Sequence, residues 1–527
     1  MNDRQRSPRQ LVSLSKLFPE AVVAAGEEIL ARSCSSRVKS KRLGFGSHHV
    51  FVSRPALADD AAADAQAAID AGAGAILTDR MLPISAPQCV VPDVDAAYAV
   101  LHHELAGRPS DRLLTIGILG THGKTSVALY AAAIFKHVGG RCGYWTTLGA
   151  SEHGERPFRK EERDCRTVNR WMKSAADDNC VAAVIEVSDT MLNDRSAAGL
   201  SFDVLVVPSL RENQRYDKTL SRKLEQATAD ACGQLKEHGV VVFNADDARA
   251  ARWVSRHDLP AIGYGLNADC EVRGVRRSTA DGEHLAMISA GRSVLPLEAS
   301  EGEYLLRHKI GGLAVAYACG LELHEAVAGV EKMKRIPGRL EAIANDRGLD
   351  VVVDRGDQAD RLAVAMHSLN TSGRPTVIVA EVPEAATPAQ RAAYGRVLSK
   401  TASRVILTQS RHSILVGQKL AWEVVDGFES PTQVELIPNR RVAIEAAILE
   451  ANAGSLVVLT GMGTEAWMPP REKTLLRDID VASAALRSRE SLFTATDAVE
   501  SLQRSQPTGG PTSTLRLHRE PTARHGN

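Results

Sequence analysis

Continuous apolar runs, rather than alternating apolar and polar positions, mark the strands that the sequence predicts in the middle of the chain. The clearest runs lie at residues 113–119, 181–187, 204–207 and 240–243. Strands of a parallel sheet read in this way because the helices that connect them cover both faces of the sheet. We therefore predict a central α/β domain over residues 110–337, built around a parallel sheet.

Two further α/β units are predicted on either side of this domain. Residues 338–490 contain a second set of apolar runs, at 350–353, 376–380, 405–408 and 456–460. Residues 1–107 contain an Ala-rich helix at 56–71, short strands at 74–77 and 89–91, and a helix at 95–105. The segment from Gly107 to Ser110 is a predicted linker. Residues 506–527 lack periodicity and are predicted to form a disordered tail.

The composition limits the kinds of molecule that the chain is expected to bind. Lys plus Arg equals Asp plus Glu at 64 each, so no net charge draws the chain to nucleic acid or to an anionic membrane. The 8 cysteines are scattered without a C-x-x-C pair, which is typical of reduced thiols. No segment approaches 18 uninterrupted apolar residues, and no leader is recognisable at the start. We expect a cytoplasmic protein with small-molecule substrates.

The strongest candidate for chemistry is a glycine-punctuated turn between a strand and a helix. It reads Gly117-Ile118-Leu119-Gly120-Thr121-His122-Gly123-Lys124-Thr125-Ser126. Glycines allow backbone N–H groups to converge on phosphate oxygens, and Lys124 adds a mobile positive charge. The Thr125 hydroxyl stands where it could hold magnesium. The turn predicts a phosphate-binding loop.

A carboxylate at the end of another central strand complements this loop. Glu186 closes the apolar run 181–187, and ligands of open α/β sheets collect beyond the carboxyl ends of strands. Magnesium prefers oxygen ligands and keeps several waters, so one hydroxyl, one carboxylate and nucleotide oxygens suffice. Thr125 and Glu186 are therefore the predicted metal ligands.

The loop pattern G-T-[NH]-G-K-T-[ST] resembles the ATP loop of the Mur ligase family, and the chain as a whole is most similar to its UDP-N-acetylmuramoyl-tripeptide synthetases. Ser35-Ser36-Arg37, Val50-Phe51-Val52 and Ala73-Gly74-Ala75 resemble the family's N-terminal domain. The resemblance implies a three-domain α/β architecture. A central P-loop parallel sheet would be flanked by an N-terminal domain that binds a UDP substrate and a Rossmann-like C-terminal ligase domain.

The same resemblance assigns roles to further residues. Asn244, in Asn244-Ala245-Asp246-Asp247, would face the nucleotide base; Arg339, after Pro337-Gly338, would reach ATP from the hinge; Asp354 would contact the nucleotide sugar. The implied catalytic residues are Lys124, Glu186 and Arg339. The implied nucleotide-binding set is Gly120, Thr121, His122, Gly123, Lys124, Thr125, Ser126, Asn244, Arg339 and Asp354.

The chain departs from the family where the chemistry is most exacting. Asn213 and Gln214 stand where the family has Asp-His, and no Lys of the 226–230 region matches the family's carbamylated lysine, although Lys218 and Lys223 lie nearby. The Asp-Asn-Pro-Arg motif that reads the amino acid becomes Thr408-Gln409-Ser410-Arg411, and a Gly-rich segment becomes Ala380-Glu381-Val382-Pro383-Glu384. The Thr-Thr-Pro segment is absent, with Thr146-Thr147 near a related position.

The resemblance implies an ATP-dependent amide ligase with ATP and Mg²⁺ as cofactors. Such an enzyme adds an amino acid to a UDP-muramoyl peptide precursor of peptidoglycan through an acyl phosphate. The departures leave two alternatives open: a nucleotide-binding pseudo-ligase with a regulatory or scaffolding role, and a P-loop ATPase with another substrate. The sequence assigns no particular amino acid.

Overall fold

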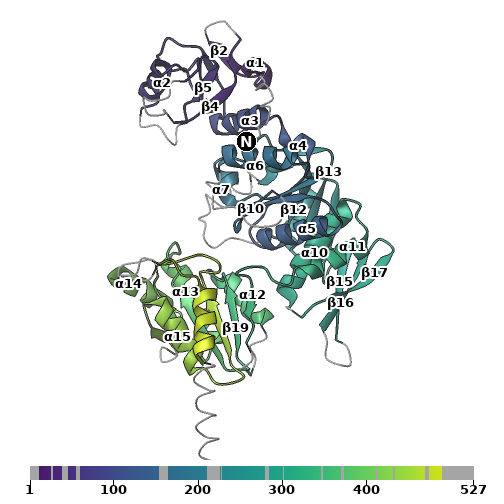
Figure 1. Ribbon diagram of the computed structural model, residues 1–527, viewed down its shortest axis with the longest axis vertical. Helices are drawn as coiled ribbons and strands as arrows, with labels where there is room; N and C mark the ends of the chain where they lie inside the picture. Colours follow the sequence, from purple (N-terminus) through teal and green to yellow (C-terminus); the bar gives the residue numbers. More distant parts are fainter. Residues whose placement is uncertain are drawn as a thin grey trace, which may run out of the picture.

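Three sheets, each flanked by helices, follow one another along the molecule in chain order (Figure 1). The computed structural model describes residues 11–24, 28–37, 45–54, 60–152, 164–210, 226, 228–278, 284–300, 302–345, 348–369, 373–410, 414–430, 434–468 and 474–489. The predicted tail, 506–527, and the first residues of the predicted 56–71 helix lie outside the described residues.

The N-terminal unit holds a 5-stranded sheet in the order β2-β7-β6-β5-β4, parallel except for β2. Its strands are β2 (Val22–Ala24), β4 (Ser33–Ser35), β5 (His49–Val52), β6 (Ala75–Thr78) and β7 (Gln88–Val90), and a separate ladder pairs β1 (Val12–Ser13) with β3 (Leu30–Ala31). Its helices are α1 (Leu14–Leu17), α2 (Ala61–Asp70) and α3 (Val94–Leu105). Asp60 and Asp93 cap α2 and α3 by accepting backbone N–H groups of the first turn, which fixes where these helices begin.

The central unit holds a 10-stranded sheet in the order β10-β9-β11-β8-β12-β13-β14-β15-β16-β17. Its strands are β8 (Leu114–Ile118), β9 (Cys142–Thr146), β10 (Gly149–Ser151), β11 (Ala182–Glu186), β12 (Phe202–Val207), β13 (Leu235–Asn244), β14 (Ala261–Gly265), β15 (Val272–Ser278), β16 (His284–Ala290) and β17 (Ser293–Glu298). Its helices are α4 (Pro109–Arg112), α5 (Lys124–His137), α6 (Cys165–Asp177), α7 (Asp189–Asn193), α9 (Ala248–His257), α10 (Glu303–Ala318) and α11 (Leu323–Lys332). The sheet is parallel from β9 to β15, as the apolar runs predict.

Antiparallel strands extend the parallel part of the central sheet at both of its edges. β10 runs antiparallel to β9, and β16 and β17 form an antiparallel extension beyond β15. The residues of β16 alternate between buried and more exposed positions, because helices cover only one face of the sheet there. Such a strand therefore gives no continuous apolar run in the sequence.

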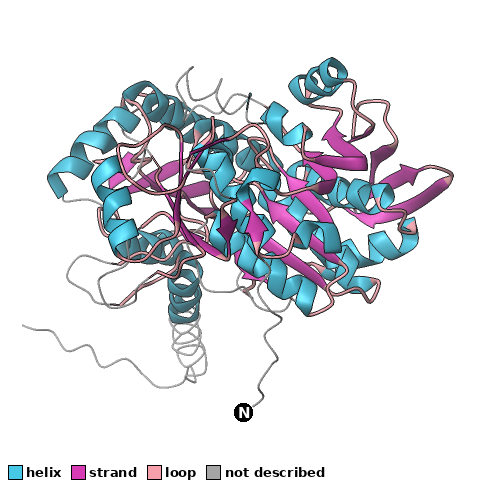
Figure 2. Cartoon of the chain, turned by 90° about the horizontal axis from the view of Figure 1, so that it is seen from above, coloured by secondary structure: helices cyan, strands magenta, loops and turns pink. Residues whose placement is uncertain are grey.

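Helices cover both faces of the parallel part of the central sheet (Figure 2). On one face, Ile116 and Ile118 of β8 pack with residues of α5, α10 and α11. On the other face, Ile185 and Leu205 pack with residues of α6 and α9. β8 is therefore buried from both sides, and the loop that follows it leaves the sheet from a fixed point.

The C-terminal unit holds a 6-stranded sheet in the order β18-β19-β23-β20-β21-β22, parallel except for β18. Its strands are β18 (Glu341–Ile343), β19 (Asp350–Asp354), β20 (Thr376–Glu381), β21 (Arg404–Thr408), β22 (Val434–Leu436) and β23 (Leu456–Thr460). Its helices are α12 (Ala359–Ser368), α13 (Pro388–Thr401), α14 (Ile414–Val425) and α15 (Arg440–Glu450), and residues 478–489 are also helical. Among the residues described, no helix has both the length and the apolar character needed to cross a bilayer.

A buried histidine ties the N-terminal unit to the central one. His103, on α3, pairs through Nδ1 with Asn169 Oδ1 of α6 at 2.7 Å and through Nε2 with Ser110 Oγ of α4 at 2.8 Å. Burial lowers the pKa of His103, so the ring is neutral at pH 7, with Nδ1–H donating to Asn169 and Nε2 accepting from Ser110. The predicted linker Gly107–Ser110 therefore contains a fully buried residue, Ser110, that takes part in the junction.

Replacing His103 by Leu should lower the free energy of unfolding by about 2 kcal/mol, because the Asn169 oxygen is left buried without its partner. Thermal and denaturant unfolding measure the change. His324→Leu is the matched control, since the His324 side chain is 65% exposed. Equal stability of the two variants would contradict a structural role for the junction.

Candidate functional site

The glycine turn after β8 is held open by backbone conformations that favour glycine. Gly120 has φ +114°, and a Cβ there would lie 2.4 Å from the Ser209 carbonyl oxygen. Gly123 has φ +83°, and its Cβ would lie 2.7 Å from His308 Nε2. The Thr121 N–H donates to the Ser209 oxygen at 2.8 Å, which anchors the loop to the segment after β12. The loop fits the phosphate cradle that the sequence predicts, because it brings the start of α5 to the carboxyl edge of the sheet.

Thr125 and Glu186, the predicted metal ligands, are in contact. Thr125 Oγ1 donates to Glu186 Oε2 at 2.9 Å and lies 3.0 Å from Thr147 Oγ1, and the Thr147 N–H donates to the same carboxylate oxygen at 2.7 Å. Both residues are buried. This set of hard oxygen donors at the start of α5 has the chemistry that magnesium prefers. Among the described residues no cluster of three or more His, Cys, Asp or Glu side chains could hold a metal ion, so nucleotide oxygens and water would complete such a site.

Lys124 is not solvated. Its Nζ donates to the Gly120 carbonyl oxygen and to Asp189 Oδ1, the latter at 3.0 Å. Asp189 is the first residue of α7, and Val187 and Ser188 connect it to the strand that ends in Glu186. The Asp189 carboxylate therefore compensates the positive charge of Lys124, and the two hydrogen bonds hold the lysine side chain across the loop.

A cavity of about 290 Å³ lies between this loop and the C-terminal unit. Its walls come from the loop itself, from the ends of β9 and β11, and from the segments before and after β19. Arg339 and Asp354 line it opposite Lys124, Thr125 and Glu186. Charged residues of both units therefore line one cavity: Lys124 and Glu186 belong to the central unit, and Arg339 and Asp354 belong to the C-terminal unit.

The hinge that carries Arg339 is tightly constrained. Leu340 has φ +44°, a conformation that side chains other than glycine rarely adopt, and its N–H donates to Asp354 Oδ2 at 2.9 Å. Asp354 Oδ1 accepts the Gly356 N–H at 2.7 Å. Burial raises the pKa of Asp354, and the Arg339 charge and these backbone N–H groups oppose that rise. Asp354 thus fixes both the hinge and the loop after β19.

A second, more apolar cavity of about 310 Å³ adjoins the first, and His122 lines both. Asn244 lines this second cavity, as the resemblance implies for a residue facing a base. Its amide is committed locally, since Nδ2 donates to the Pro208 oxygen at 3.1 Å and Oδ1 accepts the Asp246 N–H at 3.1 Å. Asn244 would therefore shape this wall rather than reach outward with a free amide.

His308 was missed by the sequence analysis. It lies on α10 and lines the apolar cavity, and its Nδ1 is buried without a hydrogen-bond partner. Tyr304 packs edge-on against its ring, with the two ring centroids 4.4 Å apart. Burial lowers the pKa of His308 to about 3, so the ring is neutral at physiological pH. A single histidine inside a helical pattern carries no recognisable signal in the sequence.

The central and C-terminal units are also joined by a contact between a histidine and a carboxylate. His122 Nε2 of the loop lies 2.9 Å from Asp360 Oδ2 of α12. The pKa of Asp360 lies below its ordinary value: burial acts to raise it, and the hydrogen bond and charge of His122 outweigh that effect. His122 thus links the two units as well as lining both cavities.

The predicted site residues fall into one region of the fold. All ten nucleotide-binding candidates except Gly120 and Asn244 line the polar cavity of about 290 Å³, Asn244 lines the apolar one, and Gly120 contributes its carbonyl oxygen to Lys124. Thr147, noted in the sequence without a role, completes the contact between Thr125 and Glu186. Asn213, Gln214, Lys218, Lys223 and Arg411 lie outside the described residues.

Two of the family departures in the C-terminal unit have a structural explanation. Arg440 is fully buried, pairs with Asp478 through two hydrogen bonds of 2.6 and 2.8 Å, and donates to Thr408 Oγ1 at 2.9 Å. Glu381 accepts from Thr408 Oγ1 at 2.6 Å and lies 3.5 Å from Arg440. Glu381 and Thr408 therefore belong to a buried polar network that holds the ends of β20 and β21.

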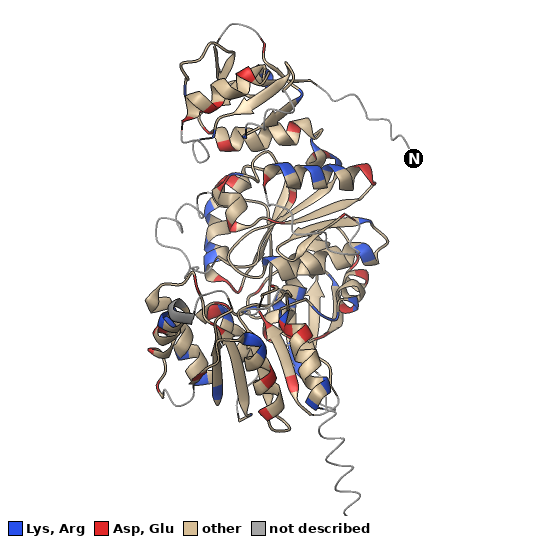
Figure 3. Cartoon of the chain, turned by 60° about the vertical axis from the view of Figure 1, so that its left-hand side comes forward, with Lys and Arg blue, Asp and Glu red and all other residues tan. Residues whose placement is uncertain are grey.

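Charge is distributed evenly over the molecule. Figure 3 shows Lys and Arg positions interspersed with Asp and Glu positions along the ribbons of all three units. We therefore expect ligand binding to depend on the charged residues that line the cavity between the central and C-terminal units.

Comparisons with known proteins agree with this fold and site. The family model described as the Mur ligase middle domain matches residues 118–298, and the model described as Mur ligase, glutamate ligase domain, matches residues 338–463. Together the two models span more than half of the chain. The chain belongs to the Mur ligase family.

Individual relatives are distant. The chain is 25% identical over 437 residues to UDP-N-acetylmuramoyl-L-alanyl-D-glutamate–2,6-diaminopimelate ligase of Halalkalibacterium halodurans, covering 81% of this chain and 89% of that protein. A solved structure of a ligase of the same name is 20% identical, with a TM-score of 0.64 over 91% of this chain and 100% of that one. The MurF ligase of Thermotoga maritima in complex with ADP is 15% identical, with a TM-score of 0.56 over 86% of this chain and 98% of that one. These structures support the predicted three-domain fold.

Replacing Lys124 by Ala should weaken ATP binding about tenfold to a hundredfold, because a charge-assisted contact to phosphate is lost. Isothermal titration with ATP measures the change. Lys136→Ala is the control, since Lys136 lies exposed near the end of the same helix, α5. Unaltered ATP affinity in Lys124→Ala would refute the assignment of the loop.

Proposed function

We propose that this chain is an ATP-dependent amide ligase that joins an amino acid to a UDP-muramoyl peptide in peptidoglycan biosynthesis. The observation that carries the proposal is the cavity of about 290 Å³ in which Lys124 and Glu186 of the central unit face Arg339 and Asp354 of the C-terminal unit. Membership of the Mur ligase family and the names of the relatives support it.

ATP would bind with its phosphates on the glycine loop and its base in the adjoining apolar cavity. The positive φ values of Gly120 and Gly123 leave room for a phosphate chain where a side chain would clash with the surrounding residues. His308 and Asn244 would line the space for the base, and Asp354 would lie near the sugar. The ADP complex of the Thermotoga maritima relative is consistent with nucleotide binding in this fold.

Thr125 and Glu186 would hold magnesium, with Thr147 keeping the carboxylate in place. When bound there, the ion would screen the negative charge of the phosphate oxygens. The donor set fits, because it offers oxygen atoms only and leaves coordination positions for nucleotide and water. A second metal site is not assigned to any of the described residues.

The reaction follows from the charges that face the cavity. The acceptor carboxylate attacks the γ-phosphoryl group, so that a carbon–oxygen–phosphorus linkage forms and ADP leaves with the electrons of the broken bond. Lys124 and Arg339 neutralise the charge that spreads over the transferring oxygens. An amine then attacks the acyl phosphate, and phosphate and one proton leave as the amide forms. The residues act mainly by positioning and electrostatics, with the hinge at Leu340 presenting Arg339.

Phosphate release from ATP should require both a UDP-muramoyl dipeptide and an amino acid. Purified full-length chain is assayed with each component omitted in turn, and Lys124→Ala serves as the blank. Phosphate release that needs neither compound would indicate the ATPase alternative. ATP binding without release under every condition would indicate the pseudo-ligase.

Replacing Glu186 by Gln should raise the magnesium concentration needed for half-maximal phosphate release about tenfold, because a neutral amide is a weaker ligand than a carboxylate. A magnesium titration at saturating ATP measures the shift. Glu325→Gln is the control, as the Glu325 side chain is 45% exposed on α11. An unchanged magnesium requirement would remove Glu186 from the metal site.

A further inference from the structure

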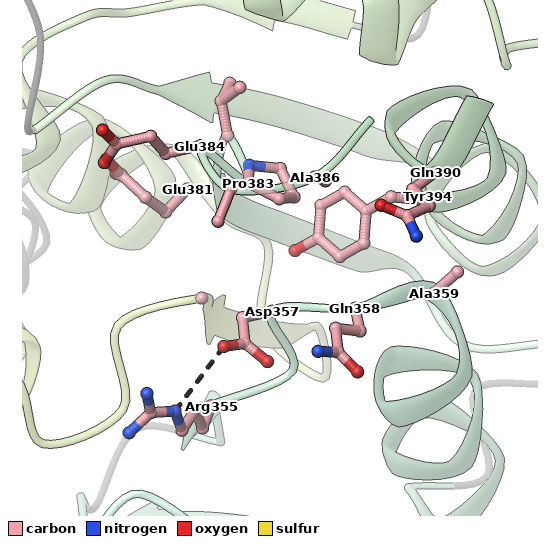
Figure 4. A pocket seen from close by; sticks show the side chains of 13 residues that line it. Arg355, Asp357, Gln358, Ala359, Glu381, Pro383, Glu384, Ala386, Gln390 and Tyr394 are labelled. Carbon is pink, nitrogen blue, oxygen red and sulfur yellow. Dashed lines mark ion pairs between the residues drawn. The ribbon is translucent and has the colours of Figure 1, made fainter. Parts of the chain in front are cut away.

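Several basic side chains that line the cavity of about 290 Å³, called here the phosphate-facing cavity, are paired with carboxylates of the same chain. Two of them belong to the C-terminal unit. Arg355 lies 2.9 Å from Glu465 and 3.6 Å from Asp357, and Figure 4 shows the pair with Asp357. Arg361 Nη1 lies 3.0 Å from Asp357 Oδ1. A ligand that carries phosphate groups therefore meets cations that other anions hold.

The lysine of the phosphate loop is paired in the same way. Lys124 Nζ donates to Asp189 Oδ1 at 3.0 Å, and the two side chains are only 10% and 23% exposed. Water and salt screen a pair at this depth much less than they screen a surface pair. Asp189 also lines the phosphate-facing cavity. Its carboxylate therefore takes a place on Lys124 that a phosphate oxygen would otherwise take.

The histidine of the loop contacts a carboxylate of the other unit. His122 Nε2 lies 2.9 Å from Asp360 Oδ2, and the two side chains are 17% and 30% exposed. His122 lines both the phosphate-facing cavity and the apolar cavity, and Asp360 lines the apolar one. A nucleotide with its phosphates on the loop and its base in the apolar cavity would therefore pass beside this contact.

Both carboxylates disfavour a bound nucleoside triphosphate. ATP with one magnesium ion keeps a net negative charge, and like charges repel more strongly in a half-buried cavity than in water, because the effective dielectric constant is lower. A phosphate group that binds Lys124 must displace Asp189 or remain beside it as a second anion. Either arrangement lowers the affinity for ATP below the value that the loop would give without the carboxylate.

We propose that Asp189 and Asp360 compete with the nucleotide phosphates for the basic side chains of the loop, so that the described conformation is an autoinhibited state. ATP binding takes Lys124 from Asp189 and His122 from Asp360. Because Asp360 belongs to α12, the second exchange also releases a contact between the central and C-terminal units. The inference rests on ATP binding at the loop, as in the proposed function, and assigns a form of regulation to that site.

The test measures nucleotide binding to the full-length protein by isothermal titration with magnesium, in the unaltered chain and in Asp189→Asn and Asp360→Asn. ATP affinity should rise about tenfold in each variant, because a competing charge is removed while the shape of the side chain is kept. AMP affinity of Asp189→Asn should stay within about twofold of the unaltered value. AMP lacks the β- and γ-phosphates that the lysine of a phosphate loop binds.

Two further variants and a stability measurement separate competition from other effects. Asp189→Ser, which is neutral and shorter, should also bind ATP more tightly. Asp480→Asn is the matched control, since Asp480 lies 3.8 Å from Arg477 and its side chain is 64% exposed, and its ATP affinity should not change. Without nucleotide, Asp189→Asn should melt at a lower temperature because Lys124 loses its carboxylate partner, and saturating ATP should raise its melting temperature more than that of the unaltered chain.

Unchanged or weaker ATP affinity in both Asp189 variants would overturn the inference for Lys124 and make Asp189 a residue that positions the lysine. The same result in Asp360→Asn would overturn it for His122. An equal gain for AMP and ATP in Asp189→Asn would also contradict competition with the β- and γ-phosphates.

The titrations contain neither acceptor nor amine, so the inference and the proposed function fail separately. Raised ATP affinity in the variants, with no phosphate release under any condition, would contradict only the ligase function. Phosphate release by the unaltered chain, with unchanged ATP affinity in the variants, would contradict only the competition by the two carboxylates.

Discussion

The hydrogen-bonded contact between Thr125 and Glu186 is the interaction on which the rest of the site depends. It joins the first turn of α5 to the end of β11, two elements that are distant in the sequence and adjacent in the sheet. Thr147, from the turn after β9, holds the same carboxylate oxygen. The first turn of α5 and the turn after β9 thus converge on one carboxylate oxygen at the end of β11, and the proposed phosphate loop, Lys124 and the proposed metal ligands lie around this point.

The C-terminal unit completes what the central unit begins. His122 reaches Asp360 across the boundary, and the hinge at Leu340 is held by Asp354. Arg339 lines the phosphate-facing cavity. The next residue, Leu340, has a positive φ that Leu rarely adopts, and a flexible linker would not maintain such a conformation. The geometry therefore links the placement of the Arg339 charge to the docking of the two units.

Much of this organisation could be predicted from the sequence. The apolar runs at 113–119, 181–187 and 456–460 correspond to strands β8, β11 and β23, and the glycine turn lies where a strand feeds a helix. Lys124, Thr125 and Glu186 could be proposed as site residues because their chemistry is tied to fixed places in that pattern. The antiparallel extension β15–β17 was not predicted, since half-buried strands alternate between apolar and polar positions and give no continuous apolar run. His308, Asp189 and Asp360 could not be found either, because their significance comes from burial and from missing or unusual partners that only the folded chain reveals.

In the proposed reaction, a carboxylate is phosphorylated in the cavity between the central and C-terminal units before an amine replaces the phosphate. The most direct measurement uses a UDP-muramoyl dipeptide whose acceptor carboxylate is labelled with ¹⁸O, in the presence of ATP, magnesium and an amino acid. Phosphate released by a ligase should carry one ¹⁸O atom from that carboxylate, detected by mass spectrometry. Phosphate that takes its oxygen from water alone would contradict the account and indicate hydrolysis of ATP.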